Sequence, residues 1–310
     1  MPPQPNEEDA AFVARLAGVA GAVERVLETF LADAPRPGEI ARPPRLMAAM
    51  RHAALAGGKR LRPFLVVETA RLLGRDDPGI VQAGAAVELL HCYSLVHDDL
   101  PAMDDDTLRR GRPTSHVVFG EGQAILAGDA LLTEAFALMS REPGDASLAA
   151  RKLRAIRIVA DAAGACGMVG GQAIDLEAAG AGASFDGDGL RAMHARKTGA
   201  LIRASAAAGA VMAGATEAQL QAIERFASEL GLAFQIVDDI LDVEGASHSL
   251  GKTAGKDAAA GKPTYPALFG LEASRRMAAD CVGRALGALE AGHLHGQLPA
   301  IATWVTSRSN

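Results

Sequence analysis

Five aspartates crowd the short stretch HDDLPAMDDDTLRRGRP, which spans residues 97–113 of the 310-residue chain. At neutral pH aspartate side chains are ionised, and crowded carboxylates repel one another unless protons or cations compensate them. Arginines follow at once, so anion-binding groups stand beside the acidic ones. The stretch therefore predicts a site that takes a cation. The aspartates are Asp98, Asp99, Asp104, Asp105 and Asp106, and the arginines are Arg109, Arg110 and Arg112.

A second acidic motif, FQIVDDILD, spans residues 234–242. In both motifs an apolar helical pattern ends in paired aspartates, because Pro101 disfavours continuation of the first helix and Gly245 that of the second. Carboxylates at a helix C-terminus oppose the helix dipole, which is already negative there. Bound cations would reverse that local field. We therefore expect the two ends to face one another across a helical bundle.

The spacing of the carboxylates narrows the ligand set. Asp238 and Asp242 are four residues apart and share one helix face, so both can reach one site. After Asp98 the next carboxylate must come from beyond the proline, and the spacing leaves Asp104 and Asp105 equally open. Carboxylate oxygens suit Mg²⁺ or Ca²⁺, and the calcium-loop pattern is absent. Because Mg²⁺ usually combines one or two carboxylates with substrate phosphates, magnesium and a polyphosphate ligand are predicted.

Basic motifs supply what a polyphosphate needs. They are GGKRLRP at residues 57–63, RKTG at 196–199 and LGKTAGK at 250–256. One such motif alone is usually solvated surface charge. Together, beside two aspartate motifs, they indicate phosphate clamps.

The elements that must position these residues are predicted to be helices. Hydrophobic residues make up 49% of the chain and aromatics only 4%, with abundant alanine, which favours packed helices over sheet. Alternating strand patterns bounded by hairpin turns are missing. We therefore predict an all-α fold in one domain covering residues 1–310, with residues 1–9 frayed and a surface loop at 178–189, where Asp186 or Asp188 caps the next helix. Apolar periodicity places helices at Ala11–Phe30, Pro44–Leu55, Pro63–Leu73, Ile80–His97, Ala124–Met139, Leu190–Val211 and Leu220–Val243.

Composition also limits partners and location. A net charge of −6 without a basic block argues against nucleic acid as a partner. The polar, acidic N-terminus does not resemble a signal peptide, and no apolar run is expected to reach a membrane-spanning length of about 18 residues. Cys92, Cys166 and Cys281 lie among apolar residues and are expected to be buried and reduced. We expect a cytoplasmic protein without stable membrane insertion.

Six motifs in order resemble those of the trans-isoprenyl diphosphate synthases, and among them the bacterial-type farnesyl diphosphate synthases. They are GGKRLRP, DDLPAMDDDTLRRG, GGQAIDL (170–176), KTG, FQIVDDILD and GKPTYP (261–266). The resemblance implies an all-α bundle around a central cavity, usually a homodimer. It also implies a Mg²⁺-dependent reaction, with three ions when substrate is bound. An allylic diphosphate, dimethylallyl or geranyl, loses its diphosphate, and isopentenyl diphosphate attacks the resulting carbocation. Farnesyl diphosphate is the implied product.

The resemblance further assigns roles to single residues. The implied metal ligands are Asp98, Asp104 and Asp238, supported by Asp99 and Asp242, with Asp239 in the same catalytic set. The residues implied to contact the allylic diphosphate are Arg109, Lys197, Thr198, Gln235, Lys252 and Lys262. Those implied to hold isopentenyl diphosphate are Lys59, Arg62, His91 and Arg110. Gln172 and Asp175 are expected to hold metal-bound waters or Lys197.

Product length is expected to depend on Tyr93 and its neighbour Ser94. Tyr93 precedes Asp98 by five residues, about 7.5 Å deeper along a helix. A bulky aromatic there resembles the farnesyl-producing members of the family, and it would fill the space that a further isoprene unit needs. Two alternatives stay open, namely a synthase of geranyl or geranylgeranyl diphosphate and a non-catalytic regulatory subunit. Such a subunit would be free to lose aspartates or clamps, and none is missing.

Overall fold

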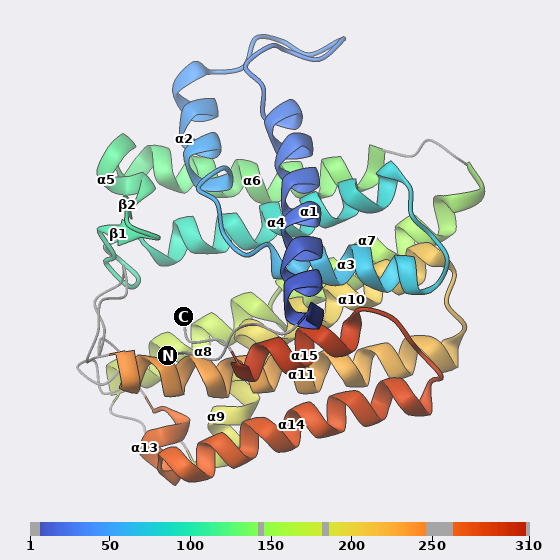
Figure 1. Ribbon diagram of the computed structural model, residues 1–310. Coiled ribbons are helices and arrows are strands. Elements are labelled where there is room, and N and C mark those ends of the chain that lie inside the picture. Colours follow the sequence, from blue (N-terminus) through green and yellow to red (C-terminus); the bar gives the residue numbers. More distant parts are fainter. Residues whose placement is uncertain (1–6, 142–145, 182–185, 246–262, 308–310) are drawn as a thin grey trace.

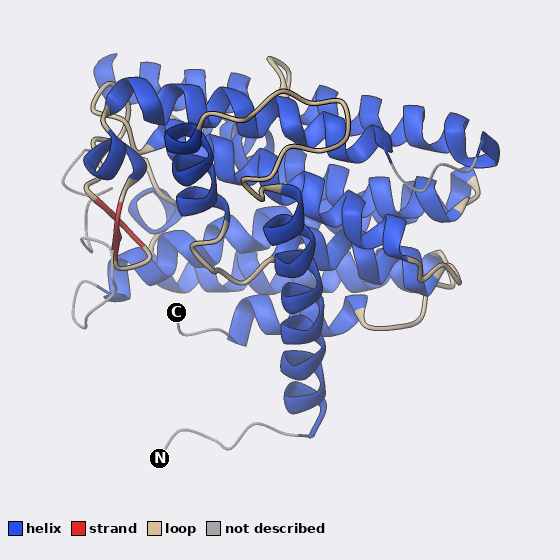
Figure 2. Ribbon diagram, turned by 90° about the horizontal axis from the view of Figure 1, so that it is seen from above, coloured by secondary structure: helices blue, strands red, loops and turns tan. Residues whose placement is uncertain are grey.

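The computed structural model describes residues 7–141, 146–181, 186–245 and 263–307 (Figure 1). In chain order its elements are α1 (Glu7–Phe30), α2 (Pro44–Ala54), α3 (Leu61–Leu72), α4 (Pro78–Asp98), β1 (Leu108–Arg109), β2 (Arg112–Pro113), α5 (Ser115–Phe119), α6 (Glu121–Arg141), η1 (Ala146–Leu148), α7 (Ala149–Ala163), α8 (Met168–Ala181), α9 (Gly187–His194), η2 (Ala195–Gly199), α10 (Ala200–Ala213), α11 (Glu217–Gly245), α13 (Tyr265–Phe269), α14 (Leu271–Ala291) and α15 (Leu298–Ser307). Long helices run across the molecule in stacked layers from α6 through α4, α3 and α10 to α11 and α14. α1 crosses these long helices at a steep angle (Figures 1 and 2).

The all-α prediction is confirmed, and each predicted helix is present with its ends shifted by a few residues. The described chain also contains helices that were not predicted, namely the short α5 and α13 and the longer α7, α8, α14 and α15. In α14 the buried positions recur at helical spacing but are mostly small or polar, which leaves little hydrophobic contrast to detect. They are Ser274, Ala278, Cys281, Ala285 and Leu289.

Two local predictions need correction, at residues 178–189 and 190–211. α1 begins at Glu7 and so includes part of the segment expected to be frayed, while residues 1–6 lie outside the described part. Of the loop expected at 178–189, α8 takes the residues up to 181 and α9 those from 187. Asp186 is the capping residue, since its carboxylate accepts the Gly189 N–H at 2.8 Å. The helix predicted over 190–211 is interrupted by the π turn η2.

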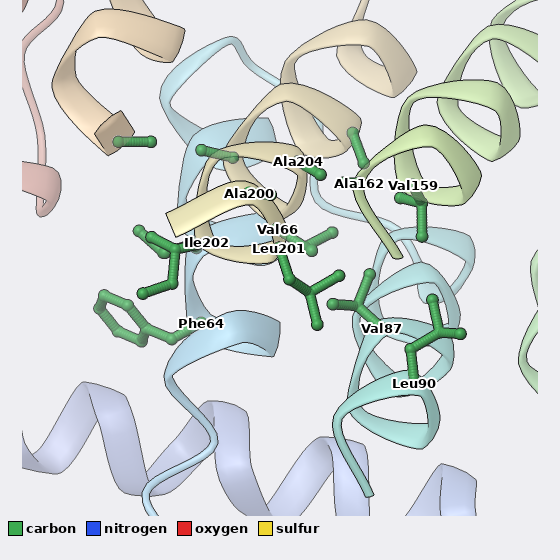
Figure 3. Packing of buried hydrophobic residues seen from close by; sticks show 14 of the residues in the cluster. Phe64, Val66, Val87, Leu90, Val159, Ala162, Ala200, Leu201, Ile202 and Ala204 are labelled. Carbon is green, nitrogen blue, oxygen red and sulfur yellow. The ribbon is translucent and has the colours of Figure 1, made fainter. Parts of the chain in front are cut away.

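The core is built largely from short side chains. Nearly all of α10 is buried, and this helix packs against α3, α7 and α11. Because alanine side chains are short, the neighbouring helices approach closely. Figure 3 shows Leu201 and Ala204 of α10 meeting Val66 of α3, Val87 of α4 and Val159 of α7. This packing fixes the helices that carry the acidic and basic motifs.

α4 is long and apolar enough to span a membrane by length and composition. It has 21 residues, and its most apolar 18-residue window has a mean hydropathy of 1.3. This corrects the expectation that no apolar run reaches such a length. In the bundle, 72% of its most apolar window is buried, as in the core helix of a soluble protein. Cys92 on this helix and Cys281 are buried as expected, whereas Cys166, between α7 and α8, is exposed.

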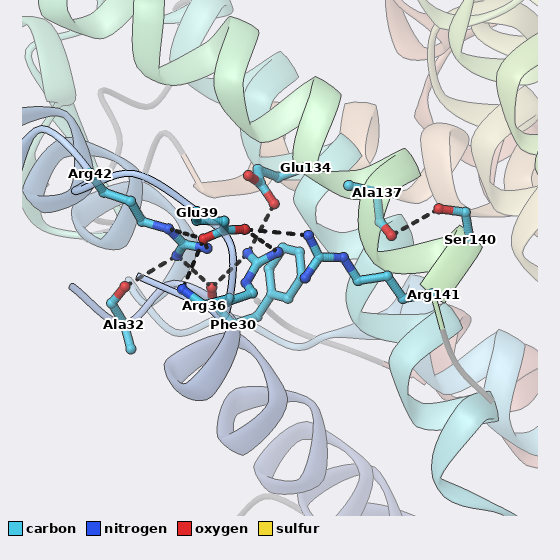
Figure 4. A network of polar contacts seen from close by, with 9 residues as sticks. All are labelled: Phe30, Ala32, Arg36, Glu39, Arg42, Glu134, Ala137, Ser140 and Arg141. Carbon is cyan, nitrogen blue, oxygen red and sulfur yellow. Dashed lines mark hydrogen bonds and ion pairs between the residues drawn. The ribbon is translucent and has the colours of Figure 1, made fainter. Parts of the chain in front are cut away.

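A polar network ties the connection between α1 and α2 to α6 (Figure 4). Arg36 donates to the Phe30 carbonyl at 3.2 Å and to Glu134 at 3.1 Å, and its guanidinium lies 4.0 Å from the Phe30 ring centre. The Arg36 N–H and the Arg42 guanidinium lower the pKa of Glu39 to about 2. The carboxylate is therefore ionised at all ordinary pH values, and the network persists.

Candidate active site

The first aspartate motif wraps around the C-terminal end of α4. Asp98 is the last residue of the helix, and the N–H of Asp99 donates to the Leu95 carbonyl at 3.1 Å. The chain then folds back, and the N–H of Asp104 donates to the Asp98 carbonyl at 2.9 Å. Asp104 is half-buried and electrostatically coupled to Asp98, whereas Asp105 is exposed with a φ of 49°. The fold thus pairs Asp98 with Asp104, a choice that the spacing left open.

Asp98 lies in a place where its charge is only partly compensated. Burial, with the charges of Asp104 and Asp99, raises the pKa of its carboxyl to about 6 in spite of the opposing effects of Lys197 and Arg109. Within the described ranges no three carboxylate, imidazole or thiol side chains converge on one point. A cation would relieve the carboxylate repulsion, and with so few protein ligands it would need oxygens from a phosphate. The donor set therefore fits Mg²⁺ carried by a diphosphate.

A β-hairpin with a two-residue turn contains the arginines that follow the motif. β1 and β2 pair antiparallel, and Arg110 and Gly111 between them have φ values of 53° and 72°, as a tight primed turn requires. Arg109 in β1 forms a bidentate pair with Asp99, with Nη2 2.5 Å from Oδ1 and Nε 2.9 Å from Oδ2. The Asp99 side chain is 5% exposed. Asp99 therefore holds Arg109 in place, and its predicted contact with a metal stays a prediction.

The second motif divides its aspartates between two faces of α11. Asp238 and Asp242 are half-buried on one face. Asp239 is buried, accepts the Tyr265 N–H at 2.9 Å and lies 3.8 Å from Nε2 of His194. Burial lowers the pKa of His194 to about 4, so its imidazole is neutral. Asp239 thus joins α11 to α13 by a hydrogen bond, while the other two aspartates share the face expected to meet the ligand.

Lys197 and Thr198 lie on the π turn η2, a widened turn of a kind found often at functional sites. Lys197 Nζ is 2.6 Å from Oδ2 of Asp175 on α8, as expected from the sequence. α8 can approach η2 this closely because Gly171 has no side chain. A Cβ at this position would lie only 2.2 Å from the backbone nitrogen of Lys197. Both amide atoms of Gln172 are buried without a hydrogen-bond partner among the described residues. Buried amides are normally paired, so Gln172 fits a site that takes a polar ligand.

The three cations of the GGKRLRP loop have different surroundings. Arg60 has a φ of 50°, and its buried guanidinium donates to Glu88 at 2.7 Å. Lys59 is exposed, with its ammonium 5.2 Å from the ring centre of Trp304 on α15. Nε of Arg62 is buried without a hydrogen-bond partner in the described part of the chain, and burial lowers the pKa of this guanidinium. Arg60 therefore anchors the loop, and Lys59 and Arg62 are held beside it.

His91 lies on α4 and is surrounded by arginines from other parts of the chain. Burial lowers the pKa of its imidazole well below 6.5, and the positive charges of Arg62, Arg110, Arg109 and Arg60 lower it further. His91 is therefore neutral near pH 7. This cationic surrounding favours an anion beside His91 and argues against an ordinary core histidine.

Arg110 joins the hairpin to the GGKRLRP loop. Its guanidinium donates to the Gly57 carbonyl, and a Cβ at Gly58 would lie 2.4 Å from Nη1 of Arg110. Burial lowers the pKa of Arg62, and the carboxylate of Asp238 is among the charges that oppose this effect, so the loop also lies near the second motif. Cations from three distant parts of the sequence thus meet at the ends of α4 and α11.

The remaining predicted residues fall in three groups. Gln235 on α11 is half-buried, and Tyr93 on α4 is buried. The Ser94 hydroxyl donates at 2.9 Å to a carbonyl of its own helix. Lys252 and Lys262 lie outside the described residues.

Trp304, His194 and Tyr265 make contacts that the sequence reasoning did not assign. The available signals were that Trp304 is the single tryptophan and that Tyr265 belongs to the motif GKPTYP. Neither signal names the partner that each residue contacts.

Comparison with known proteins places this geometry in a family. The sequence model of a family described as polyprenyl synthetase matches residues 43–290. The chain belongs to the polyprenyl synthetase family. The matched region runs from α2 into α14 and includes every motif that the sequence analysis singled out.

Relatives in this family include enzymes with different product names. The chain is 48% identical over 246 residues to farnesyl diphosphate synthase of Escherichia coli (strain K12), covering 79% of this chain and 82% of that protein. It is also 48% identical over 240 residues to a chloroplastic geranylfarnesyl diphosphate synthase of Leucosceptrum canum, covering 76% of this chain and 65% of that protein. A crystal structure of an FPP/GFPP synthase from Zymomonas mobilis superposes with a TM-score of 0.83 at 36% identity, covering 96% of this chain and 98% of that one. This polyprenyl synthetase is therefore an enzyme of the prenyltransferase class.

Proposed function

We propose that this polyprenyl synthetase adds isopentenyl diphosphate head-to-tail to dimethylallyl and then geranyl diphosphate, giving farnesyl diphosphate in a Mg²⁺-dependent reaction. The observation that carries the proposal is the presence of two cationic sets beside the acidic ends of α4 and α11. Lys197 and Arg109 lower the pKa of Asp98, whereas Arg62 and Arg110 are the cations that most lower the pKa of His91, with a smaller effect from Arg109, which acts on both groups. A condensation of two diphosphates needs two such sets.

The first set suits the allylic diphosphate. Asp98, Asp104 and Asp238 would hold Mg²⁺, in three ions when substrate is bound, and the metal would supply Lewis-acid neutralisation of the leaving diphosphate. Lys197 and Arg109 would donate to the diphosphate oxygens and stabilise the negative charge that grows as the carbon–oxygen bond breaks. Their carboxylate partners hold both cations ready. We propose that Asp242, Thr198, Gln235, Lys252 and Lys262 complete this half of the site.

The second set suits isopentenyl diphosphate. Lys59, Arg62 and Arg110 bring permanent positive charge, and the neutral His91 imidazole can donate one hydrogen bond. Fixing this diphosphate would orient the double bond of the acceptor toward the allylic carbon, which reduces the entropy cost of the bimolecular step. Proton loss from the new chain then completes the condensation.

The farnesyl product rests on Tyr93. Overall similarity does not distinguish products, since the named farnesyl and geranylfarnesyl synthases are both 48% identical to this chain. Tyr93 is 5% exposed and stands about 7.5 Å behind Asp98 along α4. A chain growing away from Asp98 along α4 would meet its ring, which fills the space that a further isoprene unit needs. A geranylgeranyl product is the second candidate, because members of this family with that product name are also close relatives.

We propose that the protein acts as a homodimer. Apolar side chains that are 44–52% exposed lie on α5 and α6, two helices that pack against one another, and exposed apolar surface of this kind can mark an interaction site. They are Val117, Val118, Ile125 and Leu126. The formal charge of −6 supports the absence of a nucleic-acid partner. We further propose a single domain over residues 1–310, a cytoplasmic location and no stable membrane insertion.

A turnover assay tests the function. The purified protein is incubated with labelled isopentenyl diphosphate, Mg²⁺ and either dimethylallyl, geranyl or farnesyl diphosphate, and the dephosphorylated products are separated by chain length. We expect farnesyl product from the first two primers and little extension of the third. Accumulation of geranylgeranyl product would overturn the product assignment. Absence of labelled product with every primer would overturn the proposed reaction.

A further inference from the structure

Gly128 lies buried in the middle of α6, where a glycine destabilises a helix relative to alanine. The reason for its presence is a neighbour on another helix. A Cβ at this position would lie 2.1 Å from Nε2 and 2.4 Å from Cδ2 of His97. The imidazole of His97 therefore occupies the space that any larger residue would take.

The backbone of α6 also fixes the orientation of this imidazole. Nε2 of His97 lies 3.0 Å from the Ile125 carbonyl oxygen, and because a carbonyl only accepts, Nε2 carries the hydrogen. The same nitrogen is 3.8 Å from Oδ1 of Asp129. α4 and α6 pack along one another in this region (Figure 1). His97 is thus held directly against the backbone of α6.

The other side of His97 meets Tyr93. The two residues are one helical turn apart on α4 and share a face. Their rings meet edge to face, with centroids 5.9 Å apart and planes inclined by 81°. The Tyr93 ring is therefore backed by the imidazole, and the imidazole by the bare backbone at Gly128.

We propose that Gly128 and His97 form a backstop that sets the position of the Tyr93 ring, so that α6 helps to determine product length. The proposal rests on the proposed role of Tyr93 as the residue that stops chain growth. Gly128 and His97 are positioning residues, since neither is placed against the substrate. Their effect is predicted to appear in the ratio of products and not only in the rate.

The two residues can be changed in opposite directions. In Gly128→Ala the new methyl group displaces the imidazole from α6, and the proposal predicts that this displacement moves the Tyr93 ring into the path of the growing chain, so we expect the geranyl-to-farnesyl ratio to rise by about tenfold. In His97→Ala the backing is lost and the Tyr93 ring can retreat, so geranylgeranyl product should appear. In the double variant the methyl group added at position 128 fills part of the vacated space, and the distribution should return toward farnesyl. General destabilisation would lower all products together and would not give this reversal.

Matched controls separate this proposal from the role of Tyr93 itself. Gly122→Ala, in the same helix with nothing within 4 Å of the added Cβ among the described residues, should leave the ratio unchanged. In a Tyr93→Ala background neither Gly128→Ala nor His97→Ala should shift the ratio further. If Tyr93→Ala alone leaves the product unchanged, the stop assigned to Tyr93 is wrong. If Tyr93→Ala lengthens the product but His97→Ala and Gly128→Ala leave the ratio unmoved, the backstop alone is overturned.

Discussion

In each aspartate motif the second aspartate of the pair contacts another part of the chain, but the two partners differ in kind. At the end of α4, Asp99 pairs with the guanidinium of Arg109, which belongs to the site. On α11, Asp239 accepts a backbone N–H from Tyr265. A guanidinium is held strongly only by a charged partner such as a carboxylate. A backbone N–H needs only an oxygen acceptor, which can be neutral. The comparison indicates that Asp99 holds a cation of the site in place, whereas the hydrogen bond from Tyr265 to Asp239 joins α11 to α13.

The largest effect is expected from the first aspartate of each pair. Asp98→Ala or Asp238→Ala should lower kcat by about 10²–10³ or more, because a group that stabilises charge in the transition state is lost. EDTA should abolish turnover of the unaltered enzyme, and Mg²⁺ should restore it. Steady-state kinetics with folding checked by circular dichroism provide the measurement. The exposed Asp105→Ala is the matched control, and an equal loss in that variant would contradict the assignment.

The two cationic sets should separate kinetically. Lys197→Ala is expected to lower kcat by about a hundredfold, since its charge acts as the allylic diphosphate leaves. Lys59→Ala should mainly raise the KM for isopentenyl diphosphate, by about tenfold, because its ammonium is exposed and binds the ground state. Each substrate is varied in turn at saturation of the other. Equal changes in both KM values for both variants would show that the sets are not distinct.

The second aspartates give a smaller and more pointed test. Asp99→Asn removes the charge that holds Arg109 and should lower kcat by about tenfold. Asp239→Asn keeps an oxygen that can accept the Tyr265 N–H, and should change kcat by less than about threefold. Both side chains keep their size, so packing is matched. A greater loss for Asp239→Asn than for Asp99→Asn would reverse the contrast between the motifs.

The smallest effect concerns stability and pH without metal. Burial raises the pKa of Asp98 from 3.8 to about 6, so the folded state favours the protonated form. The corresponding stability is present below about pH 3.8 and is lost as the pH rises through 6. In EDTA, Asp98→Asn should therefore match the parent near pH 4 and exceed it above pH 6 by about 1–2 kcal/mol. Thermal melts at both pH values test this, and an advantage that is the same at both would contradict it. Asp105→Asn serves as the exposed control.

The sequence predicts the helical elements better than the contacts between side chains. Helical periodicity and chain-breaking Pro101 are enough to place Asp98 and Asp99 at a helix end. The choice of Asp104 over Asp105 depends on how the chain folds back onto the Asp98 carbonyl, which spacing does not encode. The inward turn of Asp239 needs Tyr265 from a distant helix. Long-range pairing of this kind follows from packing, and no local pattern reports it.

Two predictions are wrong for physical reasons that can be named. The helix expected over 190–211 contains a π turn. The π turn adds one residue to a single helical turn, and the apolar periodicity on both sides of it does not reveal that extra residue. Among the described residues of the loop expected at 178–189, all but Asp186 belong to helices, because a stretch of glycine and alanine resembles a loop in composition although alanine favours helices. In both places the fold departs from the local pattern near the residues that position Lys197.

The most direct test of the account is a crystal structure with Mg²⁺, isopentenyl diphosphate and an unreactive thio-analogue of dimethylallyl diphosphate. The account predicts the analogue's diphosphate bridged by Mg²⁺ to Asp98 and Asp238, with Lys197 and Arg109 on its oxygens. It predicts the other diphosphate among Lys59, Arg62, His91 and Arg110. Binding of both diphosphates away from the ends of α4 and α11, or Mg²⁺ coordinated without either aspartate, would contradict the central claim.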